Sequence, residues 1–301
     1  MNNRKNKFYK LSDGIWAYRQ DKLNMKVQTV ILAPYGGGNP YSMEDWAQTL
    51  FEQGVQVLAL QYPGRGPRIK EPQATSIRSL AQSLAKEVSK VLGKRTVYLF
   101  GHSMGALICH EIAHYLEADD MTVAGVILSG ARRPQQNTMN IQEIHNWSKE
   151  EWRSIISETI PDSLNEQMTD AVMNFFIKSL KHDYLMVAMH KQSDLSLHCP
   201  MYVIGGQADP WVEEKHLRAW SAHARGLFEF ESFAGEHFYY KGQIADILLR
   251  FGQVFPLWCV QNKEIEPPKV PRNCAHSTKV IAFQESHEPV SNALLEEGYS
   301  E

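Results

Sequence analysis

The fold of this chain is decided by one short stretch, Val97-Tyr98-Leu99-Phe100-Gly101-His102-Ser103-Met104-Gly105-Ala106. Its first four residues are apolar or aromatic and predict a short buried strand. A Gly-x-Ser-x-Gly sequence follows, and residues 106–116 then carry apolar side chains at helical spacing. A strand, a tight turn and a helix in this order are the context of a nucleophile elbow, which holds a serine at the end of a strand.

The two glycines of this turn have a physical reason to be there. Gly101 and Gly105 lack a Cβ and so relieve the crowding that such a sharp turn creates. Ser103 is expected to sit in strained backbone at the N-terminus of the helix, where N–H groups and the helix dipole favour developing negative charge. Gly-x-Ser-x-Gly also occurs by chance, so a catalytic interpretation needs an acid and a histidine later in the chain.

An acid and a histidine do follow, in the order that such enzymes use. Serine is a weak nucleophile, because its hydroxyl holds its proton until a base within hydrogen-bond reach removes it. That base in turn needs an acid to orient it, and Asp209 and His237 each lie in the loop that follows a predicted strand. The other acids fit less well, since Asp194 lies in a polar stretch and Asp246 comes after His237. We therefore predict Ser103, Asp209 and His237 as a catalytic triad.

The remaining histidines suit structural roles. His102 is next to Ser103, and a neighbour of the nucleophile in an elbow points elsewhere. His110, His114 and His216 fall on predicted helices, where a solvated or core position is the simpler interpretation.

A glycine cluster precedes the elbow in the chain. Pro34-Tyr35-Gly36-Gly37-Gly38 follows a β-rich run, and glycines at such a place let backbone N–H groups approach a ligand closely. An ordinary loop is the alternative interpretation. We expect the backbone N–H groups of Met104 and Gly36 to form the oxyanion hole, each contributing about 3 kcal/mol to transition-state stabilisation.

Strand and helix signals alternate along most of the chain. This alternation predicts an α/β fold with a mostly parallel central sheet flanked by helices, and ligands then gather at the carboxyl ends of the strands. The expected strands are residues 27–33, 55–60, 97–100, 123–128, 201–204 and 227–230, and the expected helices include residues 77–91, 213–223 and 244–255.

The chain divides into three parts by composition. Residues 1–26 are expected to form an N-terminal extension, with a candidate edge strand at 8–20, and residues 27–261 form the α/β domain. Residues 262–301 are proline-containing and polar, which predicts a poorly ordered C-terminal extension.

Strand signals stop in residues 132–197, and helices replace them. This insertion above the active end of the sheet is interpreted as a lid, with helices at about 141–146, 149–159 and 164–191. Its methionines and phenylalanines suit an apolar acyl channel, because Met adapts to varied ligands. We assign Tyr35, Met186 and Phe176 to substrate binding; the alternative is that such residues only pack the lid on the body.

Composition excludes several classes of protein. The 301 residues have a formal net charge of −3, too small to indicate nucleic acid or an anionic membrane surface as a partner. The four cysteines form no C-x-x-C pair, so neither a metal site nor a disulfide framework is expected, and no cofactor is implied. With no signal peptide and no membrane-spanning run apparent, we expect a cytoplasmic protein.

Taken together, the motifs resemble those of type II thioesterases, the free-standing editing enzymes of polyketide and non-ribosomal peptide synthesis, within the α/β-hydrolase superfamily. The resemblance spans about residues 29–255. It is carried by Pro34-Tyr35-Gly36-Gly37-Gly38 with Trp46, Tyr62-Pro63-Gly64-Arg65-Gly66 with Glu71-Pro72, Gly101-His102-Ser103-Met104-Gly105-Ala106, and Gly235-Glu236-His237-Phe238.

The resemblance implies a substrate that the residues alone do not reveal. It implies hydrolysis of the thioester that joins an acyl group to the phosphopantetheine arm of an acyl or peptidyl carrier protein. This hydrolysis would clear aberrant or stalled chains. The partner would be that carrier protein, and the enzyme would be a monomer. Two positions depart from the family: Ala33 replaces a frequent aromatic residue, and Glu236 replaces a common glycine.

Three other functions remain open at this point. A carboxylesterase would act on oxygen esters, an acyltransferase would use an alcohol or amine in place of water, and a non-catalytic synthase partner would keep the fold as a binding module.

Overall fold

The computed structural model describes residues 7–24, 26–159, 169–191, 193–255 and 258. The extension predicted at 262–301 lies outside these ranges. The strands are β1 (Phe8–Lys10), β2 (Ile15–Tyr18), β3 (Thr29–Ala33), β4 (Gln56–Leu60), β5 (Val97–His102), β6 (Val123–Ser129), β7 (Met201–Gly206) and β8 (Phe228–Phe233). The α-helices are α1 (Glu44–Glu52), α2 (Ile77–Leu92), α3 (Met104–Ala118), α4 (Ile141–Asn146), α5 (Lys149–Thr159), α7 (Asp170–Met189), α8 (Glu214–Arg218) and α9 (Ile244–Val254).

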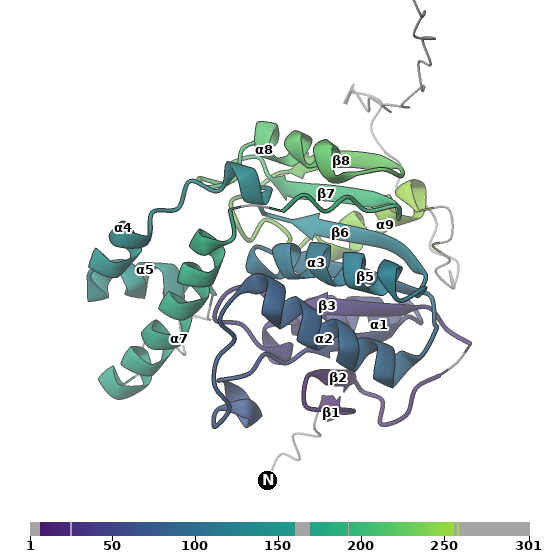
Figure 1. Ribbon diagram of the computed structural model, residues 1–301, viewed down its shortest axis with the longest axis horizontal. Coiled ribbons are helices and arrows are strands. Elements are labelled where there is room, and N and C mark those ends of the chain that lie inside the picture. Colours follow the sequence, from purple (N-terminus) through teal and green to yellow (C-terminus); the bar gives the residue numbers. More distant parts are fainter. Residues whose placement is uncertain (1–6, 25, 160–168, 192, 256–257, 259–301) are drawn as a thin grey trace, which may run out of the picture.

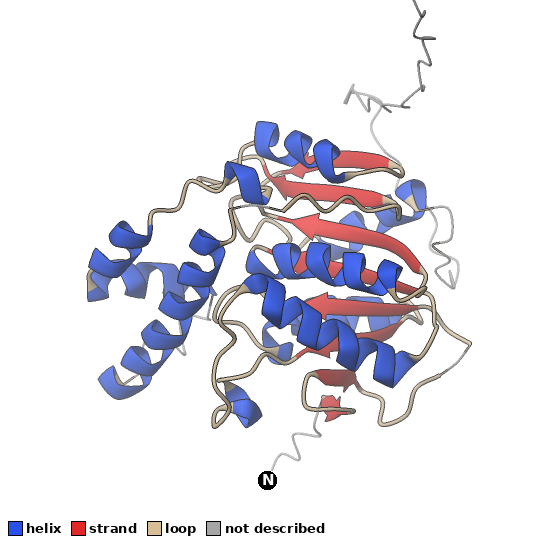
Figure 2. Ribbon diagram, in the orientation of Figure 1, coloured by secondary structure: helices blue, strands red, loops and turns tan. Residues whose placement is uncertain are grey.

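The eight strands form one sheet in the order β1-β2-β4-β3-β5-β6-β7-β8. Every neighbouring pair from β4 to β8 is parallel, whereas β1–β2 and β2–β4 are antiparallel. Helices α2 and α3 cover one face, and α1 and α9 cover the other (Figures 1 and 2). The predicted mostly parallel, helix-flanked sheet is therefore confirmed.

Burial on both faces explains the sequence of the central strands. All residues of β3, β4, β5, β6 and β7 are buried, as expected when helices cover a parallel sheet on both sides. Two apolar clusters result, one between the sheet and α2–α3 and the other between the sheet and α1–α9. The sheet is thus a rigid platform for the loops at its strand ends.

The N-terminal segment contains the candidate edge strand that the sequence indicates at 8–20, but as two strands instead of one. Residues 8–18 form a hairpin, and its second strand pairs with β4, so the hairpin belongs to the same sheet. The carboxylate of Glu87 on α2 accepts hydrogen bonds from the Ser12 hydroxyl at 2.5 Å and the Gly14 N–H at 2.7 Å. These bonds fix the turn of the hairpin against α2.

The insertion between β6 and β7 is helical, as the sequence indicates. Helices α4, α5 and α7 project beyond the carboxyl ends of the parallel strands (Figure 1). They share an apolar cluster of their own, which includes Ile144, Trp152, Met173 and Leu180. Part of the predicted helix 164–191 falls at 160–168, outside the described residues. We refer to α4, α5 and α7 as the lid.

Two further boundaries differ from the sequence prediction. The helix expected at 213–223 is divided into α8 and a 3-10 turn at Ala219–His223, where His223 turns inward and its Nδ1 lies 2.7 Å from the Leu195 carbonyl oxygen. The last strand extends to Phe233, so that all of β7 has a partner.

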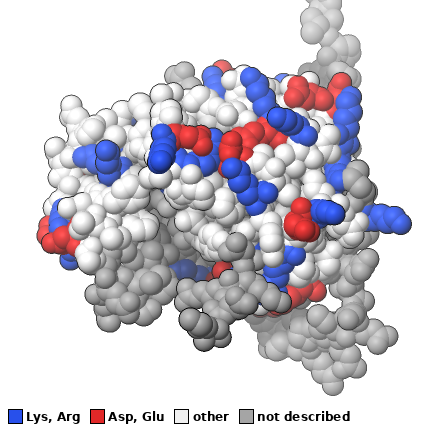
Figure 3. Space-filling view, turned by 90° about the horizontal axis from the view of Figure 1, so that it is seen from below, with Lys and Arg blue, Asp and Glu red and all other residues white. Residues whose placement is uncertain are grey.

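Both signs of charge are mixed on the surface. The face in Figure 3 carries Lys and Arg side chains interspersed with Asp and Glu. Within the described ranges, no helix combines the length and apolar character needed to cross a bilayer.

Candidate active site

Ser103 occupies a strained turn between β5 and α3. Its φ of 54° and ψ of −120° are unusual for a residue with a side chain. The turn is possible because Gly101 and Gly105 approach each other closely: a Cβ on Gly101 would lie 2.1 Å from the Gly105 carbonyl oxygen. The Ser103 N–H donates to the Ser129 carbonyl at 2.7 Å, which ties the elbow to β6. The predicted strained elbow is therefore present in the structure.

Asp209 and His237 lie in the loops after β7 and β8 and are hydrogen-bonded to each other. Asp209 Oδ2 accepts from His237 Nδ1 at 2.7 Å, and both residues are buried. Asp209 Oδ1 accepts from the N–H groups of Trp211 and Val212 at 2.9 and 3.1 Å. Because an ionised carboxylate only accepts, Nδ1 carries the proton and Nε2 keeps its lone pair. This is the tautomer that a general base needs.

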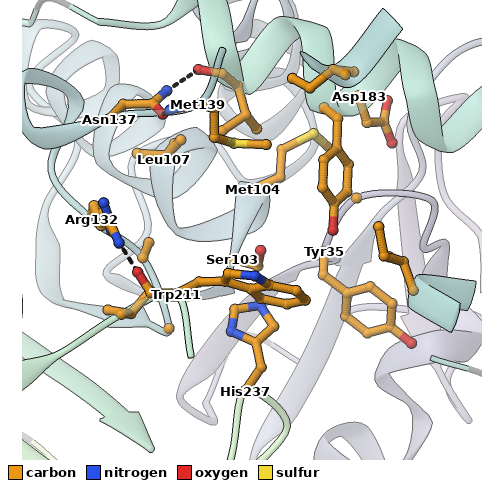
Figure 4. Close-up of a pocket in the computed structure, with 18 of the residues that line it drawn as sticks. Tyr35, Ser103, Met104, Leu107, Arg132, Asn137, Met139, Asp183, Trp211 and His237 are labelled. Atoms are coloured by element: carbon orange, nitrogen blue, oxygen red, sulfur yellow. Dashed lines mark hydrogen bonds between the residues drawn. The ribbon is translucent and has the colours of Figure 1, made fainter. Parts of the chain in front are cut away.

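The serine and the histidine line the same cavity. Ser103 follows β5, Asp209 follows β7 and His237 follows β8, so the three predicted triad residues meet at one edge of the sheet. Figure 4 shows Ser103 next to the His237 ring, with Trp211 at the same wall. Asp194 and Asp246, the alternative acids, are exposed on other parts of the chain.

The buried ring of His102 packs against the ring of His237. The two ring centroids are 4.7 Å apart, and His102 Nδ1 lies 2.9 Å from the Ser129 hydroxyl, which lies 2.7 Å from the Tyr239 hydroxyl. Burial, reinforced by the nearby His237 and Lys241, holds the pKa of His102 well below its ordinary value. His102 is therefore neutral and adds no second positive charge beside His237, in keeping with a structural role.

Trp211 covers the outer side of His237. Its ring centroid is 4.9 Å from that of His237, nearly perpendicular to it at 76°. The Arg132 guanidinium donates to the Trp211 carbonyl at 2.5 Å (Figure 4). It also donates to the Thr138 hydroxyl at 2.7 Å. The imidazole thus lies between Trp211 and His102. Sequence reasoning did not single out Trp211, although an aromatic residue two positions after Asp209 was a usable signal.

The glycine loop, residues 34–38, also borders the cavity. Gly36 and Met104 both line the cavity, and Met104 is the first residue of α3, where backbone N–H groups lack partners within the helix. Gly38 N–H donates to the Tyr35 carbonyl at 2.9 Å and closes a turn in which Gly37 has a φ of +77°. The two residues that are expected to supply the oxyanion donors therefore border the cavity that Ser103 lines.

The cavity has a volume of about 300 Å³ and a largely apolar lining. Its aromatic and aliphatic walls come from α3 and the lid and include Leu107, Ile144, Trp147, Leu180, Tyr184 and Val187. Two carboxylates, Glu143 and Glu158, stand at exposed positions of the lining. Such a site accommodates an apolar group next to the serine.

Only one of the three predicted substrate-binding residues lines this cavity. Tyr35 does, whereas Met186 is buried in the core of the body and Phe176 packs within the lid cluster. The cavity-facing side of α7 is instead formed at helical spacing by Leu180, Tyr184 and Val187. Assignment of Met186 and Phe176 to the acyl channel is therefore corrected.

The lid is tied to the glycine loop by a buried ion pair. Asp183 of α7 accepts from Arg65 at 2.7 and 2.6 Å and from the Gly37 N–H at 2.7 Å. Arg65 belongs to the Pro-Gly-Arg-Gly loop after β4, and sequence reasoning missed its partner. Among the residues that the structure describes, no three His, Cys, Asp or Glu side chains are placed to share a metal ion.

Comparison with known proteins identifies the family. A family model described as the thioesterase domain matches residues 28–252, well over half of the chain. The chain belongs to the thioesterase-domain family. A Ser-His-Asp site is typical of that family of hydrolases, so the protein is a thioesterase.

Individual relatives agree with this placement. The thioesterase is 27% identical over 225 residues to a probable cadicidin biosynthesis thioesterase of Streptomyces griseus, covering 74% of this chain and 61% of that protein, less than two thirds of it. It is 25% identical over 240 residues to the thioesterase PikA5 of Streptomyces venezuelae, covering 79% and 84%.

The structure resembles that of a solved type II thioesterase. BorB, from the borrelidin biosynthetic cluster, superposes with a TM-score of 0.70 at 26% identity, covering 80% of this chain and 97% of BorB. These findings confirm the resemblance to type II thioesterases and the α/β-hydrolase fold.

Proposed function

We propose that this thioesterase hydrolyses acyl thioesters held on the phosphopantetheine arm of acyl or peptidyl carrier proteins, and so removes aberrant or stalled chains during polyketide or non-ribosomal peptide synthesis. The observation that carries the chemistry is the 2.7 Å bond between Asp209 and His237 at the cavity that Ser103 lines. The substrate is supported by the relatives, which include a probable cadicidin biosynthesis thioesterase and the type II thioesterase BorB from the borrelidin biosynthetic cluster.

The proposed reaction has two acyl-transfer steps. His237 Nε2 takes the proton of the Ser103 hydroxyl as Ser103 Oγ attacks the thioester carbonyl carbon. The tetrahedral oxyanion is stabilised by the Gly36 and Met104 N–H groups, and collapse breaks the carbon–sulfur bond. His237 returns its proton to the departing pantetheine thiolate, which leaves an acyl-serine ester.

The second step releases the acid. Water enters in place of the thiol, and His237 removes its proton as the water oxygen attacks the acyl-serine carbonyl. Collapse of the second tetrahedral intermediate returns the proton to Ser103 Oγ and frees the carboxylic acid. Asp209 stays ionised throughout and stabilises the imidazolium that forms twice in the cycle.

The apolar cavity suits this substrate. Leu107, Leu180 and Val187 provide a surface for an acyl chain next to Ser103, and Tyr35 borders the glycine loop. The carrier protein would remain outside and reach the serine through its extended arm.

The proposal is tested with acyl-loaded carrier protein. Ser103→Ala should reduce release of the acid to the background rate and remove labelling by a fluorophosphonate, with an unchanged circular dichroism spectrum. Ser83→Ala, an exposed serine on α2, is the matched control and should behave as the wild type.

The products discriminate between the alternatives. A wild-type enzyme that cleaves a matched oxygen ester far faster than the acyl-pantetheine is a carboxylesterase. Transfer of the acyl group to an added alcohol or amine identifies an acyltransferase. Failure of the wild type to react with the fluorophosphonate would leave a non-catalytic binding partner.

A further inference from the structure

The lid contributes a buried carboxylate to the loop that holds the oxyanion donor. Asp183 of α7 has no exposed side-chain surface, and Arg65 is only 7% exposed. The two carboxylate oxygens accept from the two terminal nitrogens of Arg65, and Oδ2 also accepts from the Gly37 N–H. Arg65 also donates to the Gly38 carbonyl at 3.3 Å. One cluster therefore joins the lid, the Pro-Gly-Arg-Gly loop and the glycine loop.

Stability alone does not account for this cluster. Removing two charges from water costs several kcal/mol, and buried ion pairs can often be replaced by apolar residues without loss of stability. What the pair does supply is fixed geometry, because the planar guanidinium holds both carboxylate oxygens at once. The Asp183 oxygens are thus immobilised next to the glycine loop.

The glycine loop needs such an external constraint. Three consecutive glycines leave its backbone free in the absence of other contacts. The bond from Gly38 N–H to the Tyr35 carbonyl, with a positive φ at Gly37, defines a type II turn. Its central peptide carries the Gly37 N–H, and Asp183 is the group that accepts from it.

The turn also sets the direction of the oxyanion donor. In a trans peptide the carbonyl and the N–H point in opposite directions. The Tyr35 carbonyl faces Gly38, so the N–H of Gly36, in the same peptide, points away from Gly38. In the peptide before this one, the Pro34 carbonyl accepts a hydrogen bond from the Tyr62 hydroxyl at 2.8 Å. Asp183 and Tyr62 therefore hold the peptides on both sides of the donor.

We infer that Asp183 is a positioning residue for catalysis: by binding the Gly37 N–H while paired with Arg65, it holds the Gly36 donor in place, so that the oxyanion hole is complete only when helix α7 of the lid is seated. The inference rests on the proposed function and adds a role for the lid beyond lining the cavity. Asp183 touches the loop and acts through it.

The test compares Asp183→Asn with Asp170→Asn, a matched change at an exposed position in the first turn of α7. Active sites are titrated with a fluorophosphonate, so that unfolded protein is not counted. Hydrolysis of an acyl-pantetheine then gives kcat and KM, and an alkyl trifluoromethyl ketone, which forms a tetrahedral oxyanion on Ser103, gives an inhibition constant.

Asp183→Asn should lower kcat about ten-fold or more while KM stays within two-fold of the wild type. The inhibition constant of the ketone should rise by a factor similar to the fall in kcat, because only the charged intermediate needs the donor. Asp170→Asn should leave all three constants unchanged. A purely structural role would lower the melting temperature and the titrated fraction but not these constants.

Arg65→Lys repeats the test in a milder form if Asp183→Asn does not fold. A lysine keeps the positive charge but cannot hold both carboxylate oxygens, so kcat and ketone affinity should fall together. The inference is overturned if kcat and the inhibition constant of the ketone, measured on a folded Asp183→Asn or Arg65→Lys variant, both stay within two-fold of the wild type. A wild type that neither reacts with the fluorophosphonate nor hydrolyses the thioester would instead refute the proposed function.

Discussion

The carbonyl oxygen of Ala33 faces Gly105 so closely that a Cβ on Gly105 would lie 2.1 Å from it. This contact packs the first turn of α3 against the end of β3, and backbone on both sides prevents adjustment. We expect Gly105→Ala to reduce the free energy of unfolding by about 3 kcal/mol, as for severe overpacking. Urea unfolding followed by circular dichroism measures the change.

Gly252→Ala is the matched control for that substitution. Gly252 lies at an exposed position of α9, and an added Cβ would meet only Trp258 at 3.6 Å, an ordinary contact. Alanine should raise the free energy of unfolding there by up to about 1 kcal/mol, because glycine is the poorer helix former. Equal stabilities for the two variants would contradict the packing argument.

Asp209→Asn is expected to lower kcat by about 10⁴-fold with little change in KM. An asparagine in this place presents a donor to His237 Nδ1 and favours the tautomer whose Nε2 carries the proton, so the base is lost. Its backbone partners at 211 and 212 still find an oxygen, and the loop should keep its shape. Steady-state hydrolysis of an acyl-pantetheine gives both constants.

The acids that the sequence left as alternatives provide the controls. Asp194→Asn and Asp246→Asn change exposed side chains and should retain wild-type kcat. If either of them lost activity while Asp209→Asn remained active, the assignment of the acid would be wrong.

Trp211→Ala should lower kcat/KM about ten-fold, because an imidazole that is no longer held on its outer face spends less time aligned with Ser103. Trp211→Phe preserves a ring beside His237 and should keep most of the activity. The backbone bond from residue 211 to Asp209 is present in both variants, so the comparison isolates the ring. Equal kcat/KM values for the two variants would exclude this role.

The free energy of unfolding should decrease at acid pH because buried histidines are hard to protonate in the folded chain. Burial lowers the pKa of His110 to about 3 and that of His190 to about 4, against 6.5 for an unburied histidine. Below pH 6.5 these histidines are therefore protonated in the unfolded chain but still neutral in the folded chain. The free energy of unfolding then decreases as the pH falls. Each such group contributes about 1.4 kcal/mol per pH unit.

His110→Phe isolates one of these contributions. His110 packs against the rings of Trp220 and His223, each 5.1 Å away, and a phenyl ring suits that environment. The variant should show a shallower decrease between pH 6 and pH 4 in urea unfolding. Comparison with the wild type cancels the effect of Glu111, whose carboxyl pKa is raised by burial and which acts in the opposite direction. Parallel curves would contradict the prediction.

Much of the architecture follows from local patterns in the sequence. Strand and helix signals alternate, and the carboxyl ends of parallel strands meet at one edge, so Ser103, Asp209 and His237 could be placed together without coordinates. The helix expected at 77–91 is likewise present, as α2. These features depend on short-range physics or on topology.

The misplaced residues depend on long-range geometry. Helix α7 carries apolar side chains on several sides, so periodicity does not reveal which side faces the cavity, and Met186 and Phe176 were assigned to the wrong surface. The Arg65–Asp183 pair joins residues 118 positions apart and leaves no local signal. The candidate edge strand at 8–20 is present, but nothing in the sequence indicated that it would be a hairpin paired with β4, which is about 40 residues away.

The apolar cluster shared by α4, α5 and α7 is separate from the two clusters that pack on the faces of the sheet, so the lid side of the cavity has packing of its own. Substitutions within this cluster can reshape the chamber while the platform under Ser103 keeps its own packing. Changes in the lid should therefore alter the shape of the cavity at little cost to the stability of the sheet, provided that Asp183 is retained.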